Sequence, residues 1–314
     1  MGKFVVGIDI GGTSARAALV DLESREIIQE HTTKSSDDGQ KLVQILCSLV
    51  KDLERSSKTN VSSVGIGIAG LAHKSGIIRY SPNLPNLIEF PIGPELEANL
   101  KIPVTVGNDA TVATIAEWKM GAGRNSNNFV LATLGTGIGT GFVVDGHLLL
   151  GSNGFAGEAG HMIVDANGPI HITGQKGPWE YFASGNSINR IVQDAASRGD
   201  FPWAVEIAGT WEKVNSHLLS SGVKKQEPDS LRILNDFCRD VSIGLTNLIL
   251  LLDLDTVVIG GGICEIGEPL RNRIEIWIDE MLIGSEHRPK VEVKIAELGP
   301  NAGAVGAALS TDND

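Results

Sequence analysis

Short apolar runs alternate with glycine-rich turns along the chain, and their spacing predicts a mixed α/β protein. Residues 4–10 form a β-rich apolar run, whereas the apolar side chains of 42–53 fall on one face of a helix. In the first half we expect strands at 4–10, 15–20, 27–32, 61–68 and 104–107, with helices at 42–53 and 109–120. In the second half we expect strands at 129–134, 141–144, 147–150, 256–259 and 291–295, helices at 231–252, 270–281 and 302–309, and an irregular loop at 151–185.

Two segments repeat one plan and predict two similar lobes. Residues 5–21 and 130–145 each read as a strand, a Gly/Thr turn, a second strand and an acidic residue. A repeated opening hairpin is typical of a chain built from two related halves. The alternative is that β-hairpins resemble one another in general.

Length and charge narrow the class of protein. A chain of 314 residues is long enough for two lobes with separate hydrophobic cores. The 38 acidic and 26 basic residues leave a net charge of −12, which disfavours a nucleic-acid partner because a phosphate backbone requires a basic surface. A small anionic ligand in a cleft stays compatible with this charge.

Cysteine usage and hydropathy indicate a cytoplasmic location. Cys47, Cys238 and Cys264 are few, widely spaced and form no CxxC pair, as expected in a reducing compartment. Asp9 interrupts what would have to be the apolar core of a signal peptide, and the apolar run 248–252 is too short to span a membrane. We therefore expect a soluble protein with no membrane partner.

Three glycine-rich turns follow predicted strands and suit phosphate binding. At the first turn, Gly11 and Gly12 lack a Cβ and allow close approach of the backbone, and Thr13 adds a hydroxyl. Asp9 beside them is placed to hold Mg²⁺ through water. A tight hairpin with a buried polar residue is the alternative for this segment.

The other two turns extend the same pattern. The sequence GTGIGTG at 135–141 matches neither a P-loop nor a Rossmann fingerprint and contains no lysine, so phosphate charge there would be met by N–H groups, hydroxyls and Mg²⁺. Three glycines at 260–262 follow another strand and let a base or ribose lie against the backbone.

Two groups of polar residues suit sugar chemistry. Asp109, at a junction of strand and helix, is a candidate base for a sugar hydroxyl, because phosphoryl transfer needs little more than a positioned carboxylate and charge stabilisation. A helix N-cap is the alternative for this residue. Glu158 and His161, three residues apart, with Glu180 as a third member, suit hydrogen bonds to sugar hydroxyls. A surface ion pair or a zinc site are the alternatives for them.

In this order, the motifs resemble the ROK family (repressor, ORF, kinase), and within it the bacterial glucokinases. The resemblance rests on DIGGT at 9–13, SPNLP at 81–85, NDA at 108–110, LGTGIGTG at 134–141, GEAGH at 157–161, EYFASG at 180–185, VVIGGGI at 257–263 and NAGAVGAA at 301–308. It implies the actin-like ATPase (RNase H-like) fold, an α/β fold of two lobes around a central cleft. We expect a smaller lobe from 1–107 plus 299–314 and a larger lobe from 108–298.

The resemblance also implies residue roles. Asp109 matches the catalytic base. The implied sugar contacts are Gly70, Asn83, Asn108, Glu158, His161 and Glu180. The implied nucleotide contacts are Gly11, Gly12, Thr13, Thr136, Gly137, Gly261 and Gly262, with Asp9 near Mg²⁺. A homodimer is expected on the same likeness.

One departure from the family concerns zinc. ROK kinases usually carry a CxCGxxGC segment whose thiolates, with the histidine of the GH motif, bind a structural zinc. The matching segment here begins at His171 and ends at Pro178, and no cysteine lies between Cys47 and Cys238. His161 and His171 fall short of a closed four-ligand site, so we expect no structural zinc. We expect the loop at 165–180 to be ordered by packing, with Trp179 and Pro178 as candidates.

The function that the resemblance implies is transfer of the γ-phosphate of ATP to the 6-hydroxyl of glucose, with Mg²⁺. Kinases for mannose, fructose, allose or N-acetylmannosamine and a non-catalytic sugar sensor are the alternatives, and polyphosphate or ADP stays open as donor. A DNA-binding repressor is not expected, because a strand already begins at residue 4 and the chain is acidic. An actin-like structural ATPase would give no reason for the sugar-binding set.

Overall fold

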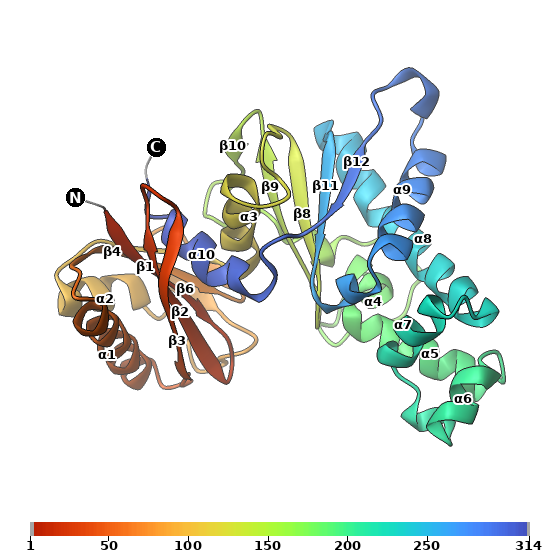
Figure 1. Ribbon diagram of the computed structural model, residues 1–314, viewed down its shortest axis with the longest axis horizontal. Coiled ribbons are helices and arrows are strands. Elements are labelled where there is room, and N and C mark those ends of the chain that lie inside the picture. Colours follow the sequence, from red (N-terminus) through yellow and green to blue (C-terminus); the bar gives the residue numbers. More distant parts are fainter. Residues whose placement is uncertain (1–2, 313–314) are drawn as a thin grey trace.

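Two mixed β-sheets with the same strand order organise the computed structural model, which describes residues 3–312 (Figure 1). Within that part, the first sheet has the order β3 (Glu26–Lys34), β2 (Ser14–Asp21), β1 (Phe4–Ile10), β4 (Val61–Ile68), β7 (Val104–Asn108). The second has the order β10 (His147–Leu148), β9 (Ile138–Val144), β8 (Phe129–Leu134), β11 (Thr256–Gly260), β12 (Glu292–Ile295). In each sheet the first strand along the chain pairs with an antiparallel and a parallel neighbour. The two segments that share one plan in the sequence therefore form equivalent hairpins.

Side chains alternate between the two faces of β1, so one face of the first sheet packs against one helix and the other face against another. Val6, Ile8 and Ile10 are fully buried and pack against α1 (Gly39–Ser57). Val5 belongs instead to a cluster with Ala304 and Ala308 of α10 (Ala302–Leu309). Asp9 has the same parity as Val5, so the pleat points its side chain toward α10 rather than into the core under α1.

The remaining elements of this half flank the sheet. α2 (Ile92–Leu100) packs beside α1, and a two-stranded hairpin of β5 (Leu71–His73) and β6 (Ile77–Tyr80) precedes it. The chain then forms β7, and α3 (Asp109–Lys119) follows β7 directly with no loop between them.

The second sheet is covered by helices on both faces. Val130 and Ala132 of β8 share a core with Phe237 and Val241 of α8 (Pro228–Leu252), and α9 (Glu268–Met281) packs alongside α8. The opposite face contributes Phe129 and Leu131 to a core with α3. Figure 1 shows α3 and α10 between the two sheets, and the green helices at the far end of the second half. These are α5 (Gly185–Ser197), α6 (Pro202–Ala208) and α7 (Ser216–Lys224).

The second glycine segment differs from the expectation. We expected the strand after it to begin at residue 141, but β9 begins at Ile138, so 138–141 belongs to the sheet and the turn is shorter. The reason is packing against α3: a Cβ on Gly141 would lie 2.1 Å from Thr114 Oγ1, and one on Gly139 would lie 2.9 Å from Ala110 Cβ. These two glycines allow close contact between strand and helix.

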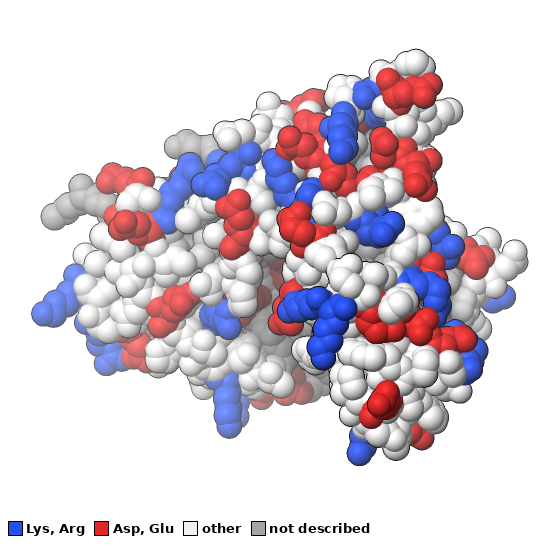
Figure 2. Space-filling view, turned by 45° about the vertical axis from the view of Figure 1, so that its right-hand side comes forward, with Lys and Arg blue, Asp and Glu red and all other residues white. Residues whose placement is uncertain are grey.

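Segment 151–185 is also more regular than expected. It contains the short 3₁₀ turn η1 (Ala159–His161) and the five-residue helix α4 (Trp179–Ala183), which are too short to show a helical period in the sequence. Among residues 3–312, no helix combines the length and apolar composition that crossing a bilayer requires. Figure 2 shows acidic and basic side chains interspersed over the face that it draws.

Candidate active site

Asn108 and Asp109 stand where β7 passes into α3, and they divide two tasks. Asn108 is the N-cap: its Oδ1 accepts hydrogen bonds from the N–H groups of Ala110 (2.9 Å) and Thr111 (3.2 Å). Its Nδ2 donates to the carbonyl of Gly70 at 3.1 Å. Asp109 is the first helical residue, and its Oδ1 accepts from Ala110 N at 2.8 Å. The N-cap of α3 is therefore Asn108, and Asp109 is not the N-cap.

Two carboxylates from different elements approach each other here. Burial raises the pKa of the Asp109 carboxyl above its usual range, while backbone hydrogen bonds partly oppose the shift. Burial, followed by the negative charge of Asp109, raises the pKa of Asp9 to about 6, and the Arg16 guanidinium partly offsets this. Arg16 lies opposite Asp9 in the β1–β2 register and donates to the carbonyl of Pro300 at 2.8 Å. The pKa values of Asp9 and Asp109 are both raised, so further positive charge nearby would favour ionisation of both carboxyls.

A cavity of about 260 Å³ opens beside these carboxylates and is lined from both halves of the chain. Its lining includes Asp9, Asp109, Thr133, Gly261 and Gly303. Gly303 lies directly over Asp9, since a Cβ there would be 2.7 Å from the aspartate Cγ. The C-terminal NAGAVGAA motif thus forms part of the cavity.

Glu158 and His161 lie together at η1, as their spacing predicts. Glu158 Oε2 is 3.9 Å from His161 Nε2. Burial raises the pKa of Glu158, His161 lowers it, and the charges of Asp109 and Glu180 raise it further. These three carboxylates therefore lie within electrostatic range of one another. His161 Nδ1 is buried and has no hydrogen-bond partner among the described residues.

Glu180, on α4, is tied to the second glycine turn. Its Oε2 accepts a hydrogen bond from the N–H of Ile138 at 2.7 Å. A Cβ on Gly137 would lie 2.0 Å from this oxygen, so the glycine allows the carboxylate to approach. Its Oε1 lies 3.5 Å from His171 Nε2. The carboxylate is thus held from two sides.

The first glycine turn lies against the SPNLP segment. A Cβ on Gly12 would be 2.9 Å from the carbonyl oxygen of Asn83. Gly70, at φ +110°, packs so closely on Tyr80 that a Cβ would be 2.3 Å from its carbonyl oxygen. The N–H of Gly11 already donates to Ser14 O at 2.9 Å, which leaves Gly12 and Thr13 to face a ligand from this turn.

A second cavity, of about 250 Å³, lies beyond the third glycine turn. Its lining includes Thr136, Asn186, Asn189, His217, Gly262 and Glu265. Gly261 lines the first cavity and Gly262 the second, so the two cavities meet at this turn. Thr136 and Gly262 are predicted nucleotide contacts, but Asn186, Asn189, His217 and Glu265, from α5, α7 and η3 (Gly262–Ile266), were missed in the sequence. Asn186 and Glu265 lie within two residues of the EYFASG and VVIGGGI motifs, which is the signal that could have indicated them.

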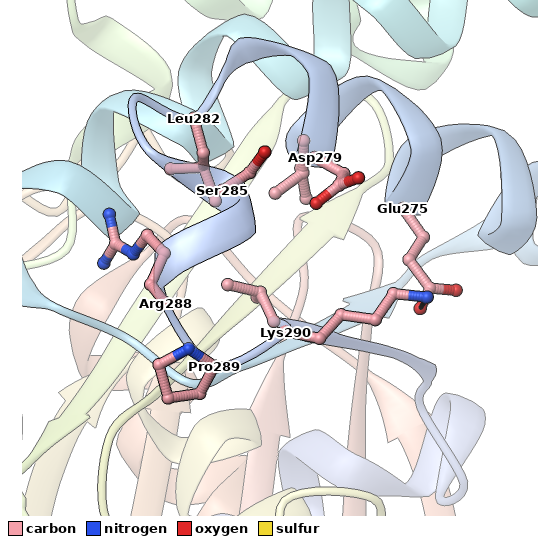
Figure 3. Close-up of a pocket in the computed structure, with 9 residues that line it drawn as sticks. Glu275, Asp279, Leu282, Ser285, Arg288, Pro289 and Lys290 are labelled. Carbon is pink, nitrogen blue, oxygen red and sulfur yellow. Dashed lines mark ion pairs between the residues drawn. The ribbon is translucent and has the colours of Figure 1, made fainter.

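A third pocket lies away from the predicted site residues (Figure 3). It holds about 10 Å³ between α9 and β12, which is room for no more than a water molecule. Figure 3 shows Lys290 reaching across it to Glu275, an ion pair of 2.8 Å. This pocket is too small to bind a substrate, and its charged side chains already pair with each other.

The loop that begins at His171 is ordered by hydrogen bonds and packing. The N–H of His171 donates to Gln175 O at 2.8 Å. Trp179 is fully buried, its N–H donates to Met162 O at 2.7 Å and its Nε1 to Asp240 O at 3.1 Å. Across residues 3–312, no three His, Cys, Asp or Glu side chains gather as a metal-binding group. The residues of this loop do not fit a zinc site.

Comparisons with known proteins show which family the chain resembles along its length. The ROK family model matches residues 5–313. A glucokinase from Streptomyces coelicolor is 31% identical over 311 residues, covering 96% of each chain. An N-acetylmannosamine kinase from Haemophilus influenzae is 26% identical, covering 96% of this chain and 93% of that protein. The structure of a ROK family glucokinase from Streptomyces griseus in complex with glucose and AMPPNP superposes with a TM-score of 0.82 at 30% identity, covering 98% of each chain.

Proposed function

The chain belongs to the ROK family and is a sugar phosphotransferase with the two-lobed actin-like ATPase fold, and we propose that it transfers the γ-phosphate of ATP to the 6-hydroxyl of glucose. The observation that carries this proposal is the position of Asp109, between the cavity at Asp9 and the group of Glu158 and Glu180. A base there would stand between a phosphate donor and a sugar.

Asp109 acts as the base in the proposed reaction. Its carboxylate accepts the proton of the 6-hydroxyl while that oxygen attacks the γ-phosphorus, and the bond from the γ-phosphorus to the bridging oxygen breaks to release ADP. The raised pKa of Asp109 makes this carboxylate a better proton acceptor than an exposed aspartate.

The sugar is held by polar groups that converge on Asp109. Glu158, His161 and Glu180 supply acceptors and an imidazole for ring hydroxyls, and Asn83 and Asn108 are the further predicted sugar contacts. Asn108 also orients the start of α3 as its N-cap, so it positions Asp109.

ATP fits across the two adjoining cavities. We assign the base and ribose to the 250 Å³ cavity at Thr136 and Gly262, and the phosphates to the 260 Å³ cavity at Gly261. Gly12, Thr13 and Gly137 line neither cavity and stay predicted phosphate contacts. Mg²⁺, when bound with ATP, supplies positive charge to the phosphate oxygens. Asp9 fits this ion through water, because burial and the Asp109 charge raise its pKa and Arg16 offsets only part of that shift, so further positive charge would favour the carboxylate.

A kinase for another hexose or for an N-acetylhexosamine is the second candidate. The Haemophilus influenzae relative, an N-acetylmannosamine kinase, supports it. Mannose, fructose, allose and N-acetylmannosamine differ from glucose in one hydroxyl, the carbonyl position or a substituent. The cytoplasmic location and the homodimer stay predictions, and polyphosphate or ADP stays open as an alternative donor.

The experiment is steady-state ADP release with MgATP and a panel of these sugars, for the wild type and Asp109→Asn. We expect glucose to give the highest kcat/KM, and Asp109→Asn to lower kcat by about 10²–10⁴-fold, since the amide cannot accept the proton. Asp200→Asn, at an exposed position in the turn between α5 and α6, is the matched control and should retain activity. Unchanged activity in Asp109→Asn would remove Asp109 from the mechanism, and a higher kcat/KM for another sugar would favour the second candidate.

A further inference from the structure

Glu180 is contacted on both carboxylate oxygens by groups that are not substrate. Ile138 N donates to Oε2 at 2.7 Å, and His171 Nε2 lies 3.5 Å from Oε1. The first contact is a backbone group whose position is set by β9. The second comes from the side chain of His171, in the loop before α4, and this histidine has no role in the proposed reaction.

His171 is itself held in place by its surroundings. Its Nδ1 is 3.0 Å from Thr173 Oγ1, and its ring meets the Tyr181 ring edge-on at 6.4 Å between centroids and 88° between planes. Tyr181 is fixed in turn, because the Arg190 guanidinium lies 3.7 Å from its ring centre and donates to its carbonyl at 2.7 Å. A ring held on two sides presents Nε2 in one direction.

The Glu180 carboxylate selects the tautomer of His171. A carboxylate oxygen only accepts, so a neutral imidazole is favoured with its proton on Nε2, toward Glu180. Nδ1 then accepts from the Thr173 hydroxyl at 3.0 Å in place of the longer contact of that hydroxyl to Gln175 Oε1 at 3.5 Å. The other tautomer would place a lone pair against the carboxylate. His171 therefore presents a donor to Glu180 whether or not the imidazole carries a positive charge.

Shielding from solvent separates this contact from an ordinary surface pair. The side chains of His171 and Glu180 are each 16% exposed, whereas those of His287 and Glu286, which also approach each other, are each 81% exposed. An exposed pair of that kind contributes little because water screens it. The His171–Glu180 contact is shielded from water, so it can orient the carboxylate more effectively than the exposed pair could.

We propose that His171 is a positioning residue for sugar binding, which acts by holding the Glu180 carboxylate between the glycine turn and the sugar. This inference rests on the proposed function, in which Glu180 contacts the sugar. With His171 present, Oε1 is fixed by a side chain and Oε2 by the glycine turn, so the orientation that receives a sugar hydroxyl is set before the sugar arrives. Without His171, Glu180 keeps its contact to Ile138 and can rotate about it.

The test compares wild type, His171→Ala, His171→Gln, Glu180→Gln and the double variant His171→Ala/Glu180→Gln. For each protein we would measure kcat, the KM values for glucose and ATP, and the midpoint of thermal unfolding. His287→Ala is the matched control, since it removes the exposed histidine of the other pair. We expect His171→Ala to raise the glucose KM about tenfold, since the carboxylate loses the contact that orients it, while kcat and the ATP KM change by less than about threefold.

Two further results are expected if His171 acts through Glu180. The Gln side chain offers an N–H donor, so His171→Gln should recover most of the glucose affinity. In the Glu180→Gln background, His171→Ala should add less than about twofold to the glucose KM, because the group it positions is already altered.

Three outcomes would overturn the inference. The glucose KM of His171→Ala could equal that of the wild type, its effect could multiply fully with that of Glu180→Gln, or the Ala and Gln variants could be equally impaired with equally lowered unfolding midpoints. The last outcome would assign His171 to loop stability alone. Failure of the proposed function is distinguishable, because it would appear in the sugar panel as a wild-type protein that phosphorylates none of the sugars. That result would overturn the proposed function and this inference with it.

Discussion

Asp9 and Asp109 come from different elements and stand beside each other in a part of the molecule that is shielded from water. Asp9 faces this way because it shares its parity along β1 with Val5, which contacts α10. Asp109 does so because Asn108 takes the cap of α3 and leaves it the first helical position. Two buried carboxylates held together destabilise the free protein, because the Arg16 guanidinium offsets only part of the cost of ionising Asp9. A functional site is where such a cost persists.

Asp9→Asn should stabilise the free protein above pH 6 and lower its kinase activity. The pKa of Asp9 is about 6 in the folded protein against an ordinary 3.8, so between these values the folded state binds more protons than the unfolded state. Stability therefore falls as pH rises through this window, and the loss is complete above pH 6. Asparagine carries no charge, so its free energy of unfolding at pH 7.5 should exceed that of the wild type by up to about 3 kcal/mol.

The measurement is urea unfolding without nucleotide at pH 7.5 and at pH 4. At pH 4 most of the difference should vanish, since Asp9 is then protonated in the folded wild type. A variant no more stable than wild type at pH 7.5 would contradict the assignment of a repelling pair.

Elements in the middle of the molecule approach one another closely at three glycines. α10 packs on β1 and β4 where Gly7 and Gly65 leave room for its backbone, and on α3 where Gly306 meets the carbonyl of Val112. A Cβ on Gly306 would lie 1.7 Å from that oxygen. These contacts explain why glycine and alanine dominate residues 302–309, which the sequence identified as a helix with the observed bounds.

Gly65→Ala should therefore destabilise the protein strongly. The added Cβ would stand 1.6 Å from the carbonyl oxygen of Ala307, and backbone cannot move aside as the end of a side chain can. We expect a loss of roughly 1–3 kcal/mol or more in the free energy of unfolding, measured by chemical denaturation. Ser62→Ala, at an exposed position of the same strand, is the control and should change stability by less than about 0.5 kcal/mol. Equal stability of the two variants would refute this packing.

At the scale of the whole molecule, two passages of the chain cross between the halves, one at α3 and the other just before α10. Glu117 joins them. It is fully buried on α3, and its Oε1 accepts from Leu298 N at 2.9 Å, while its Oε2 accepts from Glu297 N at 3.1 Å and from Ala122 N at 2.9 Å. Three N–H donors match one carboxylate, so the buried charge is satisfied. The exact boundaries of the lobes, at 107/108 and 298/299, stay predictions.

Glu117→Gln should loosen this connection. A glutamine keeps one acceptor oxygen but turns an NH₂ group toward backbone donors, so at least one N–H loses its partner. We expect the free energy of unfolding to fall by about 1–3 kcal/mol in a denaturant titration. Glu297→Gln, which breaks only the exposed pair with Arg124, is the control and should stay within about 0.5 kcal/mol of the wild type. A Glu117→Gln protein as stable as this control would show that the connection contributes little.

The sequence by itself determined most of the strands and several helices, but not α2, the β5–β6 hairpin or α5, α6 and α7. Residues 61–68, 129–134 and 302–309 have the observed bounds, because an apolar run and the residues that end it are local signals. The ordered motifs also identified the family, the two-lobed fold and a sugar phosphotransferase. The roles of individual site residues, Asp109 included, stay predictions to be tested.

Tertiary structure alone decided what those residues meet. Whether Glu180 touches Ile138 and His171, which helices line the second cavity, and why 138–141 is strand rather than loop all depend on contacts between segments distant in sequence. Such contacts leave no periodic trace, since a glycine that admits a neighbouring helix looks the same in the sequence as one that forms a turn. Periodicity and turn chemistry act over a few residues, whereas close packing is settled only when the whole chain has folded.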